Sequence, residues 1–259
     1  MLPAHDASAV DVTQPDSAAL WQHAVDLGAQ GSYAEAEQHA VAIGERVDRW
    51  SSLALSTRAS HLRQVGAPSI ALDQRAADCA VDDESSADAL VGLAADCVAM
   101  GDVDPAVSWH VEAARVARDW RTRTRWHWVG AEIAMLTGDR TMAREHARRA
   151  VLTSSGRSDR HHAKSLIVAC ATSGDLAGMD AVLDLVTVRG WHTLVWPLAL
   201  VVADHADERS GAWAEHAWAA GARATHVIEQ GLPPRLVDTW RSHPGVQRLR
   251  ASDRPLTSE

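Results

Sequence analysis

The stretch Leu20–Ala40, LWQHAVDLGAQGSYAEAEQHA, decides the fold of this chain. It predicts two short helices joined by a tight turn at Gly31. A small residue stands at Ala24, seven positions before that glycine, and another at Ala36, five positions after it. Two antiparallel helices joined by a short turn can approach closely only if the residues at their crossing are small. The stretch therefore predicts one closely packed helix pair.

The same skeleton recurs down the chain. The turn glycines are 35, 35, 37 and 36 residues apart, at Gly31, Gly66, Gly101, Gly138 and Gly174. Seven positions before them stand Ala24, Ala59, Ala94, Ala131 and Ile167. Five positions after them stand Ala36, Ala71, Ala106, Ala143 and Met179. A repeat of this period predicts five stacked helix pairs, each glycine supplying the left-handed cap that ends a first helix.

Two further patterns favour helices throughout. An aspartate, which suits a helix N-terminus through capping and the helix dipole, follows the turn glycine at Asp102, Asp139 and Asp175. Apolar residues repeat at spacings of three and four in each arm, and no segment shows sustained strand alternation. The chain is therefore expected to be all-α.

The units resemble the tetratricopeptide repeat family, whose helix pairs are about 34 residues long. The first unit is most similar, with the family's small residues, turn glycine and turn aromatic at Ala24, Gly31, Tyr33, Ala36 and Ala40. The resemblance covers residues 17–190. It implies a right-handed α–α superhelix, a solenoid of antiparallel helix pairs whose inner helices line a concave groove for an extended peptide or a partner helix.

The rest of the chain is expected to flank this solenoid. The predicted organisation is a flexible N-terminal segment at 1–16, five helix pairs at 17–190, C-terminal helical pairs or capping helices at 191–250, and a loose tail at 251–259. After Gly190 the pattern predicts helices over 193–207, 212–222 and 224–229, and a short one from Arg235 through Trp240. Repeat stacks need atypical end units, and three tryptophans are expected to pack there: Trp213, Trp218 and Trp240.

Composition restricts the environment and the partners. The net charge of −9 argues against a dedicated binder of nucleic acid or of anionic membranes. The longest apolar run, Leu194–Ala203, is interrupted by Pro197 and is too short to span a bilayer, so it predicts a buried helix. Three cysteines without a CxxC pair, and an N-terminus without a signal-peptide pattern, predict a reduced, cytoplasmic protein.

Fourteen histidines raise the question of a metal or acid–base site. The sharpest candidates are the pair His161 and His162, and the set His205, Asp207, Glu208, Glu215 and His216. Adjacent helical residues point about 100° apart and do not readily share a metal. No HExxH, zinc-type Cys/His spacing, GxSxG, phosphate loop or GxGxxG is present. We therefore expect no catalytic residues, no metal site and no cofactor.

The middle of the chain is basic. Residues 111–160 contain eleven arginines and six acids, a local net charge of +5, so the remainder carries −14. A dense cluster alternates with tryptophans: Arg115, Arg118, Trp120, Arg121, Arg123, Arg125, Trp126 and Trp128. Arginine forks and tryptophan faces favour an anion or an acidic partner. The alternative is a solvated loop with core tryptophans, and nucleic acid is disfavoured because the other −14 would repel phosphates.

The resemblance also implies which residues line the groove. By register these are Trp21, Val25, Ser56, Ser60, Arg63, Val91, Arg125, Trp128, Glu132, His161 and Lys164. The family's clamp of lysine, arginine and asparagine around a terminal carboxylate cannot form in its usual form, because the chain has no asparagine and one lysine. With Arg121 from the basic cluster, the predicted partner-binding residues are Trp21, Arg63, Arg121, Arg125, Trp128, Glu132, His161 and Lys164.

These observations favour a non-catalytic scaffold or adaptor that binds a protein or peptide partner, an acidic one where the basic repeats take part. One alternative is a regulatory or sensor module acting in trans on transcription or signalling, as in solenoids attached to bacterial transcription regulators. Another is a helical enzyme that uses scattered His, Asp and Glu residues. The sequence leaves a homo-oligomer open.

Overall fold

The computed structural model describes residues 16–44, 46–206 and 211–251. In these ranges the chain forms fourteen α-helices and a short 3-10 helix, and no strand. The prediction of an all-helical chain is therefore confirmed for the described residues. The predicted N-terminal segment and C-terminal tail lie outside them, apart from Asp16 and Ala251.

Successive helices are short and pack as neighbouring pairs. The first ten are α1 (Ser17–Gln30), α2 (Tyr33–Ala42), α3 (Arg49–Gln64), α4 (Ile70–Cys79), α5 (Asp83–Met100), α6 (Val103–Val116), α7 (Trp120–Leu136), α8 (Arg140–Ser154), α9 (Asp159–Ser173) and α10 (Met179–Val188). The others are α11 (His192–His205), α12 (Gly211–Gln230), the 3-10 helix η2 (Pro234–Leu236), α13 (Val237–Ser242) and α14 (Pro244–Ala251).

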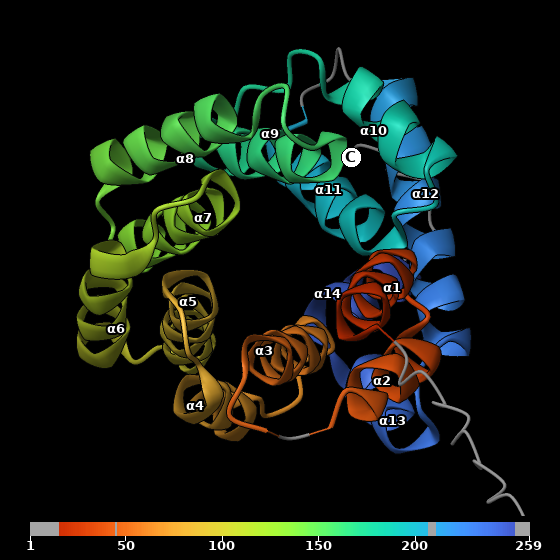
Figure 1. Cartoon of the computed structure of the whole chain (residues 1–259). Coiled ribbons are helices and arrows are strands. Elements are labelled where there is room, and N and C mark those ends of the chain that lie inside the picture. Colours follow the sequence, from red (N-terminus) through yellow and green to blue (C-terminus); the bar gives the residue numbers. More distant parts are fainter. Residues whose placement is uncertain (1–15, 45, 207–210, 252–259) are drawn as a thin grey trace, which may run out of the picture.

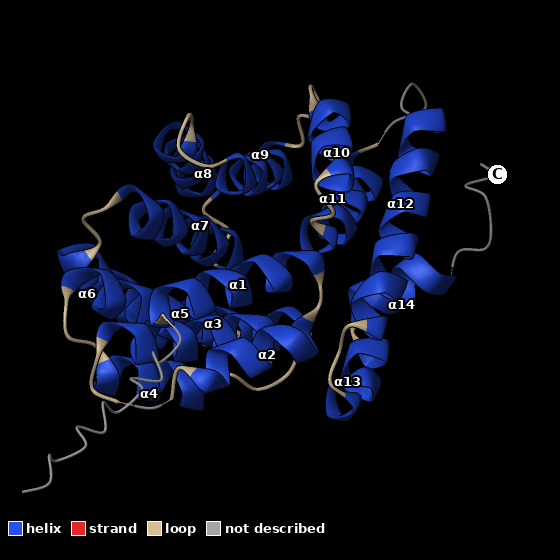
Figure 2. Ribbon diagram, turned by 45° about the vertical axis from the view of Figure 1, so that its right-hand side comes forward, coloured by secondary structure: helices blue, strands red, loops and turns tan. Residues whose placement is uncertain are grey.

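The pairs are arranged in a ring (Figure 1). Helices α1, α3, α5, α7, α9 and α11 face its inside, and α2, α4, α6 and α8 lie on its outside. The first pair lies next to the last helices, so the two ends of the helical array meet; Figure 2 shows the same closure from another side. We call the inward surface of the ring the concave face.

The turn glycines have the predicted conformation. All five have a positive φ, between 76° and 87°, a region in which a β-carbon would be strained. The four alanines seven positions before a glycine are completely buried, and Ile167 is 6% exposed. The repeated alanines are therefore buried in four of the five helix pairs, as expected for residues at a close crossing.

The prediction of a buried small residue five positions after each glycine is wrong in one unit, because Ala71 is exposed. In three other pairs the second helix begins two residues after the glycine, whereas α4 begins at Ile70, four residues after Gly66. The buried fourth position of α4, equivalent to Ala36 in α2, is therefore Asp73. A β-carbon on Gly92 would overlap with the carboxyl of Asp73. A fixed offset from the glycine cannot detect this longer turn.

The predicted capping aspartates differ among themselves. Asp139 accepts a hydrogen bond from the Met142 amide at 3.0 Å, as expected for an N-cap. Asp102 occupies the N-cap position of α6 without a side-chain bond. Asp175 does not cap a helix, because α10 begins only at Met179; it accepts from the Ala177 amide within the connecting turn.

The C-terminal helices differ from the sequence prediction in two ways. One continuous helix, α12, replaces the two predicted over 212–222 and 224–229. Its Gly221 packs so closely on α11 that a β-carbon would overlap with Ala199, so the glycine permits close packing without ending the helix. Helix α14 lies in the region predicted as helical, 191–250, but was not predicted as a separate helix. Of the three tryptophans expected at this end, Trp240 is 1% exposed, and Trp213 and Trp218 are half-buried.

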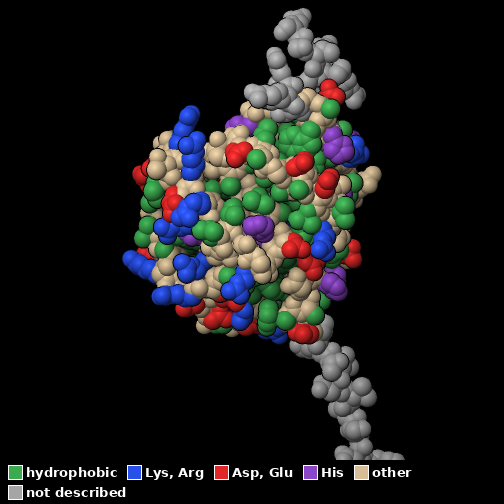
Figure 3. Space-filling view, turned by 90° about the horizontal axis from the view of Figure 1, so that it is seen from above, with side chains coloured by type: hydrophobic (Ala, Val, Ile, Leu, Met, Phe, Trp, Pro, Cys, Tyr) green, Lys and Arg blue, Asp and Glu red, His purple; other side chains and the backbone are tan. Residues whose placement is uncertain are grey.

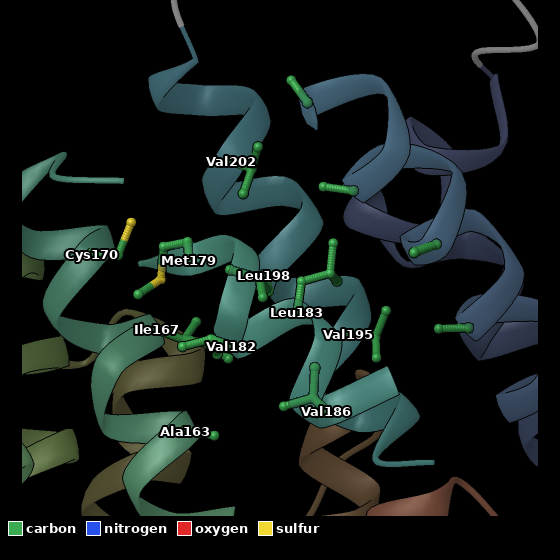
Figure 4. Close-up of a cluster of buried hydrophobic side chains, with 14 residues drawn as sticks. Ala163, Ile167, Cys170, Met179, Val182, Leu183, Val186, Val195, Leu198 and Val202 are labelled. Carbon is green, nitrogen blue, oxygen red and sulfur yellow. The ribbon is translucent and has the colours of Figure 1, made fainter. Parts of the chain in front are cut away.

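The largest apolar core lies in α9 to α12 (Figure 4). Figure 4 shows Ile167, Leu183 and Leu198, from α9, α10 and α11, directed into the space between the helices. The run Leu194–Ala203 lies within α11 despite Pro197, which confirms it as a packed helix. In the described part of the chain no helix is both long and apolar enough to cross a membrane.

A second cluster closes the ring. Tyr33 of α2 and Val65 at the end of α3 pack against Ile228, Leu232 and Trp240 from the C-terminal helices. Hydrogen bonds reinforce this contact: the Ala34 amide donates to the Gly231 carbonyl at 2.8 Å, and the Thr193 hydroxyl to the Ala29 carbonyl at 3.0 Å. The sequence did not predict that the ends would meet.

Candidate functional site

The eight residues predicted for partner binding come together on the concave face. Trp21 lies on α1 and Arg63 on α3. Helix α7 supplies Arg121, Arg125, Trp128 and Glu132, and α9 supplies His161 and Lys164. None of the eight is exposed, since each side chain is covered by its neighbours. The register predicted from the resemblance therefore selected one contiguous cluster.

The first part of this cluster is an ion-pair network around Arg63. Its guanidinium pairs with Asp73 Oδ2 at 3.1 Å and with Asp96, which also accepts from the Ser69 hydroxyl. Burial raises the pKa of Asp73 to about 7; Arg63 opposes this shift and Asp96 adds to it. One buried oxygen on each carboxyl, Asp73 Oδ1 and Asp96 Oδ2, has no hydrogen-bond partner.

The second part joins α7 to α5 through Asp88. Arg121 Nη1 lies 3.0 Å from Asp88 Oδ2 and Arg125 Nη1 lies 2.5 Å from Asp88 Oδ1. Arg121 also pairs with Glu84 at 3.2 Å, and its guanidinium carbon lies 5.3 Å from the centre of the Trp21 ring. Both arginines are thus neutralised by nearby carboxylates, and neither presents a free fork.

Sequence register misassigned α5 in this network. Val91, predicted for the groove, is 2% exposed and packs in an apolar cluster with Ala94 and Cys97. The carboxylates of α5 that meet the concave cations are Glu84, Asp88 and Asp96. Glu84 and Asp88 are four residues apart and therefore share a helix face, a signal that the sequence contained.

The third part is aromatic and lies between α7 and α9. The Trp128 indole donates to the Ser165 hydroxyl at 2.9 Å. The His161 ring stacks on Trp128 with a centroid distance of 5.4 Å, and Lys164 Nζ lies 4.3 Å from the Trp128 ring centre. Trp120 contacts His161 edge-on at 5.1 Å. The tryptophan faces are therefore covered by protein groups.

Arg160 completes the cluster and was missed by sequence reasoning. It is half-buried on α9, and its Nη1 donates to the Val25 carbonyl of α1 at 3.1 Å. Because it precedes Lys164 by four residues, the two cations share a helix face. That spacing was visible in the sequence, but its significance depends on α1 lying opposite α9.

The two α9 cations are not neutralised as those of α3 and α7 are. Neither Arg160 nor Lys164 forms an ion pair with any carboxylate that the structure describes. Burial lowers the pKa of Lys164 to about 8, and nearby arginines add to this while Glu132 opposes it. Burial and four surrounding cations lower the pKa of His161 to about 2, so its imidazole is neutral. The α9 side of the concave face is therefore electropositive.

Most of the predicted basic region lies elsewhere. Arg121, Arg125 and Arg160 face inward, whereas the other eight arginines of residues 111–160 are exposed. We call these eight the outer basic face: Arg115, Arg118, Arg123, Arg140, Arg144, Arg148, Arg149 and Arg157. In Figure 3, which views the molecule from above, Lys and Arg side chains gather toward the left, the side on which α8 lies in Figure 1.

Five of the eight arginines of the outer basic face form no ion pair with a described residue. Arg115 pairs with Glu112, and Arg148 and Arg149 pair with Glu145. Within the described residues no ion pair is formed by Arg118, Arg123, Arg140, Arg144 or Arg157. Large apolar side chains are exposed on the same helices, Val107 and Val111 on α6 and Met142 and Leu152 on α8. A shallow pocket on α6 is lined by Val107, Trp109 and Val111.

The histidine pair singled out in the sequence does not share a partner. His161 Nδ1 lies 3.1 Å from the Ser158 hydroxyl and His162 Nδ1 lies 3.4 Å from that of Ser154, so the two rings have different partners. In the described ranges no three His, Cys, Asp or Glu side chains are placed to hold a metal. Of the second candidate set, Asp207 and Glu208 lie outside the described residues.

Fold and site together define a ring of helix pairs with a charged concave face and a basic outer face. Comparison with protein-family models, with curated proteins and with solved structures finds no match to this chain. The function is therefore argued from these two surfaces.

Proposed function

We propose that the chain is a non-catalytic, cytoplasmic scaffold of the helical-repeat type that binds an acidic protein partner through its outer basic face. The observation that carries this proposal is a set of exposed arginines that form no ion pair with a described residue, among them Arg118, Arg123, Arg140 and Arg157. An exposed guanidinium offers several donors in a planar fork that fits carboxylates.

The finer architecture belongs to the same proposal. We assign the helix pairs to a right-handed, tetratricopeptide-like superhelix. Support comes from turn glycines with positive φ at near-constant spacing, and from the buried alanines at the crossings of the pairs. Families of this architecture present extended surfaces to other proteins, which agrees with a scaffold role.

The concave face is less suited to a whole peptide. Three of its cations are already paired, Arg63 with Asp96 and both Arg121 and Arg125 with Asp88. A peptide would have to displace these carboxylates and bury its own charges at considerable cost. We therefore assign the protein partner to the outer basic face, and we assign to the concave face a ligand that is smaller than a peptide.

The chemistry of the outer basic face also indicates the shape of the partner. Val107, Val111 and Arg115 are four residues apart and share the exposed side of α6. Apolar and basic groups on one helix face fit an acidic, amphipathic helix better than a fully extended acidic chain. Nucleic acid and anionic lipid fit less well, because the rest of the protein carries −14.

Charge reversal tests the proposal. The variant with Arg118→Glu, Arg123→Glu and Arg140→Glu should lose an acidic partner captured from the native host, by at least tenfold in recovered amount. The exposed Arg223→Glu on α12 is the control and should keep the partner. Binding should then be reproduced with the purified partner and weaken as salt rises. If the triple variant captured as much of the partner as the wild type does, the proposal would be refuted.

Arg125→Glu and Trp128→Ala test whether the concave face also contributes to partner binding. Loss of the partner in these variants, with circular dichroism unchanged, would assign the partner to the concave groove instead of the outer basic face. A regulatory or sensor role in trans is the second candidate function. The unpaired cations inside the ring favour it, because a small ligand bound there would be enclosed by the fold.

A further inference from the structure

Two cations of α9 project into the ring from the same helix face. Arg160 reaches across to the Val25 carbonyl of α1, and Lys164 reaches the Trp128 ring of α7. Their contacts thus connect α9 with α1 and α7, two other inner helices of the ring. His161, between them in sequence, is neutral and does not compete for an anion as a charged group would.

These cations carry an unusual cost. A half-buried cation loses hydration, and proteins normally offset that loss with a carboxylate. The rest of the concave face follows this rule, since Arg63, Arg121 and Arg125 each contact at least one carboxylate. Glu132 acts on Lys164 and Asp26 acts on Arg160, but neither of these described carboxylates lies within ion-pair distance of its cation. Two such cations on one face indicate a missing anion.

We propose that the concave face binds a phosphate group between Arg160 and Lys164. A phosphate monoester carries close to two negative charges at neutral pH, which matches the two cations, and its oxygens accept charge-assisted hydrogen bonds. A single carboxylate would neutralise only one of them. The nearby Arg125 adds to the positive potential at this place.

The aromatic groups around the site restrict the class of ligand further. One neighbour of the Trp128 ring is His161 and another is Lys164, while Arg121 lies over Trp21. The indole N–H groups of Trp128 and Trp21 already donate to Ser165 and Thr57. Trp128 therefore packs against Lys164 as a wall of the site, and recognition rests on charge and not on stacking with a ligand ring.

Closure of the ring fixes the far wall of the site. Helix α1 is held by the Thr193 bond to Ala29 and by the packing of His61 over Gly28, where a β-carbon would overlap with the imidazole. The Val25 carbonyl that positions Arg160 is therefore preorganised. This site shares no residue with the outer basic face, so either proposal can fail without the other.

Thermal unfolding and calorimetry of the full chain test the site with inorganic phosphate, glycerol phosphate and succinate, against sodium chloride at equal ionic strength. Inorganic phosphate should raise the midpoint in a saturable way, as a ligand of the native state does, and succinate should act at least tenfold more weakly. Comparison with glycerol phosphate distinguishes free from esterified phosphate. No stabilisation by either phosphate beyond that of chloride would overturn the proposal.

Three variants sharpen this test. Lys164→Met and Arg160→Gln should each lower the affinity for phosphate at least tenfold, and Lys164→Met should leave the ligand-free midpoint unchanged or higher. The exposed Arg118→Gln is the matched control and should bind phosphate as the wild type does. Trp128 fluorescence should change with phosphate in the wild type, because Lys164 lies over that ring. Unchanged phosphate affinity in Lys164→Met would contradict the site.

Discussion

The main-chain amide of Ala34 donates a hydrogen bond to the main-chain carbonyl of Gly231 at 2.8 Å. Ala34 lies in the first turn of α2, where amides have no acceptor within their own helix. Gly231 follows α12 almost at the other end of the described chain. This bond, with the apolar contacts of Tyr33 and Ile228 beside it, joins the two ends of the helical array into a ring.

Gly231→Ala should weaken this closure. The added β-carbon would overlap with the Gly31 carbonyl and press on the Ser32 backbone. Because these atoms are backbone, we expect a loss of roughly 1–3 kcal/mol in the free energy of unfolding, measured by urea denaturation. Gly211→Ala is the control, since nothing lies within 4 Å of its new β-carbon. Equal stability of the two variants would show that the ends do not pack in this way.

Asp73 should give the protein a specific dependence on pH. Its pKa is raised from 3.8 to about 7, so the folded state holds this proton more tightly than the unfolded state does. Stability from this group is therefore greatest below pH 3.8 and is lost as pH rises to about 7. As pH rises from 5 to 7, the free energy of unfolding of Asp73→Asn, measured in urea, should increase relative to that of the wild type by roughly 2 kcal/mol.

The exposed Asp78→Asn serves as the control for Asp73→Asn. Its stability should follow that of the wild type across the same pH range. If the difference between Asp73→Asn and the wild type did not change with pH, the carboxyl of Asp73 would not titrate as described.

His161 should make the stability of the protein depend on pH in the opposite direction to Asp73. Its folded pKa of about 2 lies far below the unfolded value of 6.5. Above pH 6.5 both states are neutral; below it only the unfolded state gains a proton, so stability is lost as pH falls. His161→Gln should reduce that loss by roughly 2 kcal/mol between pH 6.5 and 4.5. The control substitution at an exposed histidine, His226→Gln, should not reduce the loss. If His161→Gln kept the steep wild-type dependence of stability on pH, the burial of the His161 ring would be contradicted.

Arg63→Met should be strongly destabilising. It leaves Asp73 and Asp96 buried together without their common cation, and breaking a buried pair in this way costs about 3–5 kcal/mol. Adding Asp73→Asn to this variant should recover part of the loss. Arg46→Met, which removes an exposed pair with Asp48, should cost less than about 1 kcal/mol. If chemical denaturation showed a similar loss of stability for the two arginine variants, the ion-pair network around Arg63 would be refuted.

The local fold was accessible from sequence because it depends on local chemistry. Gly31 and its four equivalents need a positive φ, and Ala24 and its equivalents need a close crossing; both leave a repeated pattern. The prediction was wrong at Ala71, where a longer turn shifts the register. It also divided α12 at Arg223, which lies within one continuous helix.

The site was only partly accessible. Register selected the concave residues, but it could not show that Asp88 and Asp96 would neutralise them. Arg160 gains its meaning only from the contact with Val25. That contact depends on ring closure, which joins segments far apart in sequence and leaves no periodic signal.

Amide hydrogen exchange at Ala34, followed by NMR, tests ring closure most directly. A first-turn amide with no acceptor exchanges rapidly, whereas one bonded across a packed seam exchanges only when the seam opens. We predict protection of the Ala34 amide comparable to that of amides in the interior of α2, and loss of this protection in Gly231→Ala. Exchange of Ala34 in the wild type as fast as that of a free first-turn amide would contradict the closed ring.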